Sequence, residues 1–339
     1  MRKRLFYILQ YLIFLGAGIF LVWWQLKDMT AVEKAEFSNA FNYANYWLIV
    51  PIAIMSLLSH LSRAVRWKYL MEPLGYQPKL KNVFSVVMIG YLANSAIPRL
   101  GEILKCTFLA RYEKLNAGKL IGTIIIERTF DFICFIIFIG LTILIQINLV
   151  GNYVKEKIIK IGNTAGIPIW ANLLIIIGII TLIVICIKIL FRKFPHNKII
   201  NKINLFLEGI ATGFKTIKQL KKKRLFLMQT FFIWLLYLLQ VYIGFHAMED
   251  TSHLDIKAAC SVLTLASLAM IVTPGGIGSF PLFVMQTLLI YSIASPVGKA
   301  FGWMIWGVST AIVIITGFCC LLIIPYINRK KNEISKQHT

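Results

Sequence analysis

Long apolar segments separated by short polar ones run along most of this chain. A helix needs about 20 apolar residues to cross the hydrocarbon core of a bilayer. By that criterion the pattern predicts complete membrane spans at residues 5–26, 46–66, 120–146, 171–191, 225–247 and 301–326. We therefore expect an all-α polytopic membrane protein with a single membrane domain over residues 1–339.

Two further apolar segments are interrupted by proline and glycine. Residues 83–111 break at Pro98-Arg99-Leu100-Gly101-Glu102, and residues 257–294 break at Thr273-Pro274-Gly275-Gly276-Ile277-Gly278. The arm over residues 83–97 makes roughly 22 Å of helix, which is shorter than the hydrocarbon core of about 30 Å. We expect two broken, re-entrant hairpins beside the six spans; if they are counted as spans, the total is eight. If the four arms of these hairpins are thin spans instead, they add an even number of crossings and leave every loop on the same side of the membrane.

The distribution of charge assigns the two sides of the membrane. The chain has 36 Lys and Arg against 14 Asp and Glu, a formal charge of +22. Loop 192–224 and tail 327–339 are basic and predicted to be cytoplasmic, whereas loop 248–256 is acidic and predicted to lie outside. Both termini then lie inside, and the hairpins enter from opposite faces as an inverted pair. Because the bases lie between apolar runs, we expect anionic headgroups as partners and not nucleic acid.

The first break carries the residues expected to bind substrate. Backbone that leaves a helix at membrane depth must line a cavity or pack against protein, and paired broken segments point to a translocation site. A helix that restarts near Gly101 offers free N–H groups, and Arg99 beside them makes a site suited to phosphate. Glu102 caps the new helix, and Asn94 bonds a headgroup or a neighbouring carbonyl. The alternative for Arg99 is an interfacial arginine that reaches to the headgroups.

Charged residues also occur inside or at the ends of predicted spans. Glu127, Arg128 and Asp131 lie within one span, where charges are costly unless paired. Glu127 and Asp131 share a helix face, for which Arg99 is the expected partner; a purely structural ion pair is the alternative. Arg63 and Arg66 share a face near the end of the second span, where headgroup anchoring is favoured over substrate binding.

The second break is glycine-rich without being a nucleotide loop. Pro274, Gly275, Gly276 and Gly278 lack the Lys-Ser/Thr of a P-loop. They form either a hinge with open backbone facing a cavity or a tight turn. The sequence shows no catalytic constellation, no metal-ligand spacing and no cofactor motif, which disfavours an enzyme.

These motifs, in this order, resemble the flippase-like family built on the transmembrane region of lysylphosphatidylglycerol synthases. The resemblance starts at Arg63-Ala64-Val65-Arg66-Trp67. It continues through Asn94 to Glu102, Glu127 to Asp131 and Pro274 to Gly278. It implies a bacterial inner-membrane protein that handles phospholipids. The chain looks like the membrane half without the synthase domain. Ser279-Phe280-Pro281 stands where many members carry an acidic residue, which speaks against a proton or cation role there.

The leading hypothesis is a protein that handles or translocates phospholipids, without aminoacyl-transferase activity. Two other functions stay open: a transporter or exporter of a small anionic solute, and a membrane-embedded transferase acting on a lipid-linked substrate. The substrate, the energy source and the oligomeric state, a homo-oligomer included, are not fixed by the sequence.

Overall fold

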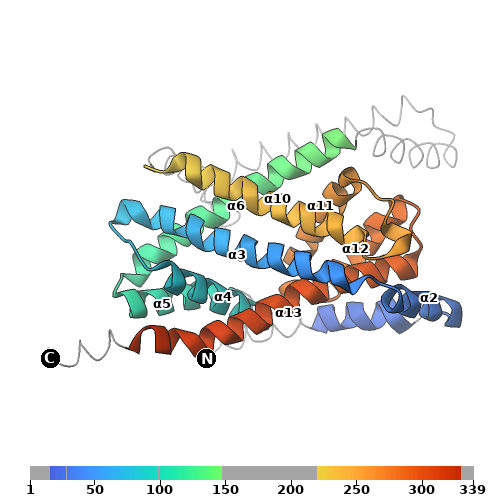
Figure 1. Ribbon diagram of the computed structural model, residues 1–339, viewed down its shortest axis with the longest axis horizontal. Coiled ribbons are helices and arrows are strands. Elements are labelled where there is room, and N and C mark those ends of the chain that lie inside the picture. Colours follow the sequence, from blue (N-terminus) through green and yellow to red (C-terminus); the bar gives the residue numbers. More distant parts are fainter. Residues whose placement is uncertain (1–15, 28, 98, 147–219, 330–339) are drawn as a thin grey trace, which may run out of the picture. The chain divides into compact units, whose positions relative to one another are not determined.

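The computed structural model describes residues 16–27, 29–97, 99–146 and 220–329 (Figure 1). These parts are helical and contain no β-strand, which confirms the all-α class. The predicted span 171–191, most of the basic loop and most of the tail lie outside the described residues. So does the N-terminal part of the span predicted from residue 5, whose C-terminal part is a helix over residues 16–27.

Four described helical segments are long and apolar enough to cross a membrane. They are Tyr46–Leu74, Ala117–Ile145, Lys223–Phe245 and Ser295–Ile327. The first contains η1 (Tyr46–Leu48), α3 (Ile49–Met71) and η2 (Glu72–Leu74); the others are α6, α10 and α13. They confirm four predicted spans. Exposed apolar side chains such as Phe231, Ile315 and Leu322 are those expected against lipid.

Both predicted interruptions separate shorter helices. The first hairpin consists of α4 (Leu80–Ala96) and α5 (Leu100–Glu113). The second consists of α11 (Ile256–Val272), the 3₁₀ turn η4 (Pro274–Gly276) and α12 (Ser279–Ile290). The 17 residues of α4 and of α11 give each helix about 25 Å, less than a full hydrocarbon core.

Proline explains where both hairpins break. Ile97 and Thr273 each precede a proline and adopt extended backbone, with φ of −136° and −128°. The ring of a following proline disfavours the helical conformation at such positions. The next helix begins in each case after a residue with positive φ: Arg99 at 68° and Gly278 at 70°.

Outside the hairpins, α2 (Ala31–Asn42) precedes the first long span and η3 (Glu249–Thr251) connects α10 to α11. The chain divides into two compact units: Met1–Glu127 with Ile217–Thr339, and Arg128–Thr216. Of the second unit, the structure describes α6 from Arg128 onward and the turn at Gln146. The single domain expected over residues 1–339 stays a prediction.

In the first unit α3 packs along α10, while α13 packs against α12 and α4 (Figure 1). The first hairpin closes on a glycine contact. A Cβ atom at Gly101 would lie 1.9 Å from the carbonyl oxygen of Gly90. Only glycine lets two helix backbones approach this closely, and this contact fixes how α5 lies against α4.

Candidate functional site

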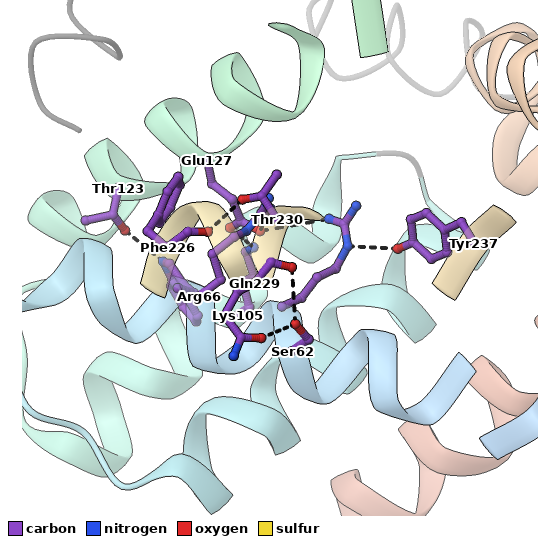
Figure 2. A network of polar contacts seen from close by, with 11 residues as sticks. Ser62, Arg66, Lys105, Thr123, Glu127, Phe226, Gln229, Thr230 and Tyr237 are labelled. Carbon is purple, nitrogen blue, oxygen red and sulfur yellow. Dashed lines mark hydrogen bonds and ion pairs between the residues drawn. The ribbon is translucent and has the colours of Figure 1, made fainter. Parts of the chain in front are cut away.

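Glu127 lies at the centre of a buried ionic cluster (Figure 2). Its Oε1 is 3.4 Å from Nη2 of Arg66 and 3.9 Å from Nη1 of Arg63, and its Oε2 is 3.2 Å from Nζ of Lys105. The exposed fractions of the side chains are 0% for Arg66, 2% for Glu127, 4% for Lys105 and 14% for Arg63. We call Arg63, Arg66, Lys105 and Glu127 the ionic cluster. Three cationic groups therefore meet one carboxylate away from the protein surface.

Three helices bring the cluster together. α3 supplies Arg63 and Arg66 from one face, as their spacing predicted. Lys105 comes from α5 of the first hairpin, and Glu127 comes from α6. The ionic cluster thus ties the hairpin to two long helices, and a movement of α5 away from α6 must separate Lys105 from Glu127.

Aromatic and hydroxyl groups complete the surroundings of the two most deeply buried cations. Nη1 of Arg66 donates to Oγ1 of Thr230 at 3.3 Å, and the guanidinium lies 5.7 Å from the ring centre of Phe226. Nζ of Lys105 lies 4.8 Å from the ring centre of Trp67. Cations over aromatic faces are attracted by the ring quadrupole, more strongly when water is excluded. The site therefore suits positive charge even though it is dry.

Around the cluster, further polar contacts join α3 to α10 and to α6. Nε of Arg63 donates to the hydroxyl of Tyr237 at 2.9 Å. The hydroxyl of Ser62 bonds the side chain of Gln229 (Figure 2). Nε1 of Trp67 donates to Oγ1 of Thr123 at 2.8 Å. α3 is thereby held by polar groups on both α6 and α10.

The predicted pairing of Arg99 with Glu127 is wrong. Glu127 pairs with Arg63, Arg66 and Lys105, whereas Arg99 is exposed and makes no hydrogen bond or ion pair with the described residues. Arg99 precedes the first turn of α5, six residues before Lys105, which places the buried cation of this helix one to two turns further on. Lys105 was not among the predicted site residues. Its signal was a single basic residue within an apolar run of a membrane hairpin.

Asn94 and Glu102 hold the tip of the first hairpin. Oδ1 of Asn94 accepts the N–H of Gly101 at 2.8 Å, and Nδ2 of Asn94 donates to Oε1 of Glu102 at 3.4 Å. Glu102 lies in the first turn of α5, where its charge suits the helix dipole. Asn94 thus has a local role, although its partners are an N–H and a carboxylate and not the carbonyl that was expected. Glu102 lies in the first turn as expected, but among the described residues it makes no side-chain hydrogen bond that caps the helix. Any contact of either residue with substrate stays a prediction.

The other predicted charges belong to the second unit. Arg128 is exposed and Asp131 is half-buried on α6. Asp131 lies four residues after Glu127 on the same helix, so the two share a face as predicted. Their participation in substrate binding stays a prediction.

The second break is a tight turn whose carbonyl groups accept hydrogen bonds from side chains elsewhere in the protein. Nε1 of Trp306 donates to the carbonyl of Gly275 at 2.8 Å, and Nε2 of Gln25 donates to that of Gly278 at 2.8 Å. The N–H of Gly276 donates to the carbonyl of Thr273 at 3.0 Å. Pro274, Gly276 and Gly278 are buried. This is the tight turn expected as one option, and it is compatible with a hinge.

Within the described residues, no group of three or more histidine, cysteine, aspartate or glutamate side chains is placed to hold a metal ion. The described site offers buried cations that hold one carboxylate, and an exposed arginine at the hairpin tip.

Comparison with known proteins gives two matches. The model of the family described as "Lysylphosphatidylglycerol synthase TM region" matches residues 7–317. A UPF0104 membrane protein of Methanocaldococcus jannaschii (MJ1595) is 24% identical over 304 residues, which cover 85% of this chain and 86% of that protein. No solved structure matches the chain.

Proposed function

The chain belongs to the lysylphosphatidylglycerol synthase transmembrane-region family, and from that premise we propose that this multi-pass membrane protein moves phospholipids between leaflets without transferring an aminoacyl group. The observation that carries the proposal is the convergence of three basic side chains on Glu127 inside a bundle of membrane helices. Buried charges in membrane segments are costly and usually functional. Guanidinium and ammonium groups are the side chains that recognise phosphate.

Arg99 is the point of first contact with the headgroup in this proposal. It is exposed at the tip of a membrane hairpin, beside the N-terminal end of α5, where the helix dipole favours an anion. Lys105 follows about 9 Å further along the same helix. A lipid phosphate held by Arg99 would thus be near a second basic group on the same rigid element.

The ionic cluster allows a buried cation to exchange a carboxylate partner for a phosphate. Lys105 and Arg66 are held by the carboxylate of Glu127 in the structure described. An arriving phosphate offers oxygens of the same charge type, so it replaces Glu127 as the partner of Lys105, while Arg66 and Arg63 still compensate the carboxylate of Glu127. The release of Lys105 from Glu127 frees α5 to move, which couples binding of the headgroup to movement of the hairpin.

The proposal is tested with purified protein in vesicles that contain a fluorescent phosphatidylglycerol or phosphatidylethanolamine. An impermeant quencher then reports how much lipid has changed leaflet. We expect the native protein to accelerate lipid movement, and Arg99→Ala and Lys105→Ala to slow it by at least about tenfold, the equivalent of 1.4 kcal/mol. Arg111→Ala, which removes an exposed arginine from the same helix, is the matched control and retains the native rate.

Other outcomes identify the other two functions. Uptake of inorganic phosphate or another soluble anion, with no lipid movement, indicates a solute transporter. A lipid species missing from a deletion strain indicates a transferase, whereas unchanged composition with altered sidedness supports translocation. An absence of lipid movement with anionic and zwitterionic lipids alike contradicts the proposal.

We also propose that the protein lies in the cytoplasmic membrane of a bacterial cell with both termini inside. The support is the excess of Lys and Arg in the loops predicted to be cytoplasmic. Reporter fusions after residues 115 and 292 test this placement, because the first is expected inside and the second outside.

A further inference from the structure

The described helices fall into two series with the same order. Each series has a long helix, a short helix, a break at a proline, a second short helix and another long helix. In the first these are α3, α4, α5 and α6, with 23, 17, 14 and 29 residues. In the second they are α10, α11, α12 and α13, with 23, 17, 12 and 33 residues.

Irregular backbone recurs at matching places in both series. Ile97 and Thr273 end the first short helix in extended conformation before a proline. Lys114 and Ser292, with φ of 55° and 62°, stand at the same distance before α6 and α13. Positive φ is uncommon in residues other than glycine, so its recurrence at one position is evidence for a repeated unit.

The series run in opposite directions. Arg63 and Tyr237 occupy the same position in α3 and α10 and bond each other directly. Three residues further along α3, Arg66 contacts Thr230 and Phe226, which lie toward the start of α10. Equivalent helices that pack antiparallel, with equivalent residues in contact, are the signature of a two-fold relation between repeats.

Charge breaks this symmetry. The positions that correspond to Lys105 and Glu127 hold Val284 and Ile305, which are 0% and 5% exposed. At these matched positions the first hairpin has an ion pair, whereas the second has buried apolar side chains. The two hairpins thus have the same order of helices but differ in charge at these positions.

We propose that the two series form an inverted repeat and that their hairpins open alternately, α4 with α5 toward the cytoplasm and α11 with α12 toward the outside. The inference deepens the proposed function, since it supplies a route by which a lipid headgroup enters from one face and leaves at the other. Inverted repeats that flank a central site are a recurring basis of alternating access. Because α4 contacts η4, opening of one hairpin changes the packing at the break of the other.

The first test is topological and does not depend on transport. In a chain whose six native cysteines are replaced by alanine, single cysteines are placed in matched loops: Gln77→Cys with His253→Cys, and Lys114→Cys with Ser292→Cys. All four positions are exposed. With a membrane-impermeant maleimide, we expect Gln77→Cys and Lys114→Cys to react only in inverted vesicles, and their counterparts only in intact cells. Reaction of both members of a pair from one side overturns the inverted repeat.

The second test asks whether the hairpins are coupled. A Cβ at Gly18 would lie 3.4 Å from that of Ile277, close to the spacing of a disulfide. Oxidised Gly18→Cys/Ile277→Cys thus fixes the second break against the helix over residues 16–27. We expect this bond to raise several-fold the maleimide labelling of Ile97→Cys from the cytoplasmic side, and reductant to reverse the change. The single variants are the controls. An unchanged rate at position 97 in the oxidised protein overturns alternation.

Neither test measures lipid movement. Topology and coupling of the hairpins are therefore decided by labelling alone, even if the proposed substrate is wrong. A failure of the lipid assay together with the expected labelling would overturn the proposed function and leave the inverted repeat standing.

Discussion

Lys105 and Glu127 form a 3.2 Å ion pair that joins the first hairpin to α6 inside the membrane domain. Each side chain is almost completely excluded from solvent. A buried pair adds little net stability when compared with apolar residues of the same size, but loss of one member leaves a charge without compensation. This asymmetry makes the pair sensitive to single substitutions.

Glu127→Ala is therefore expected to be strongly destabilising. It removes the acceptor of two buried cations, Arg66 and Lys105, which corresponds to a loss of about 3–5 kcal/mol. Denaturant unfolding of the purified protein in detergent measures the change. Glu249→Ala removes an exposed carboxylate outside the long helices and is expected to leave the unfolding midpoint unchanged. Equal midpoints for the two variants would show that the ionic cluster contributes nothing to the fold.

Removal of both partners is expected to cost less than the sum of the single losses. Lys105→Met keeps the length of the side chain without its charge, and Glu127→Gln keeps the shape of the carboxylate. In the double variant neither charge is stranded by loss of the other, so we expect a coupling of about 0.5–3 kcal/mol in the double-mutant cycle. Additive effects within experimental error would mean that the two groups do not interact in the folded protein.

The glycine contact at the hairpin tip predicts opposite effects for one substitution at two sites. Gly101→Ala places a methyl group 1.9 Å from the carbonyl oxygen of Gly90, so α5 must shift; the expected loss is about 1–3 kcal/mol or more. Gly122→Ala in α6 meets nothing within 4 Å and is expected to stabilise by up to about 1 kcal/mol, because alanine favours helix. Thermal unfolding in detergent compares them. A tolerated Gly101→Ala contradicts the close packing of α4 on α5.

The start of α2 is expected to respond to acid. The pKa of Glu33 is lowered from its ordinary value of 4.5, first by the hydrogen bond from the backbone N–H of Thr30 and then by that from its hydroxyl. A depressed pKa in the folded state means that the cap stabilises α2 at neutral pH and that this contribution disappears as the pH falls through the folded value. Amide hydrogen exchange across α2 should show protection that decreases on acidification.

Glu33→Gln supplies the control for this effect, since glutamine does not titrate. Its protection factors in α2 are expected to be lower at neutral pH and to vary little with acid. The same acid dependence in both proteins would assign the effect to another group.

The sequence predicted the parts of the fold that depend on local physics. Four long spans were placed correctly, because a helix of membrane length requires a run of apolar residues that no other structure needs. Both breaks were placed at Ile97-Pro98 and Thr273-Pro274, because proline constrains the residue before it wherever it occurs in the chain. The i, i+3 spacing of Arg63 and Arg66 placed both on one face of α3.

The sequence predicted less about the site. It singled out Glu127, Arg63 and Arg66, which the structure brings together. It favoured headgroup anchoring for the two arginines, assigned the wrong partner to Glu127 and did not include Lys105. Arg99 was the basic residue at the first break, and spacing along the chain gave no reason to prefer a lysine in the middle of the next helix.

Periodicity, length and proline chemistry thus determined by themselves that this is a helical membrane protein with two broken hairpins, since each of these acts over a few neighbouring residues. Only the tertiary structure decided that Lys105, Arg63 and Arg66 meet at Glu127, that Asn94 bonds Gly101 and Glu102, and that Arg63 bonds Tyr237. These are contacts between helices. Which side chains meet there depends on how whole helices pack, and several pairings of buried charge satisfy the same local rules.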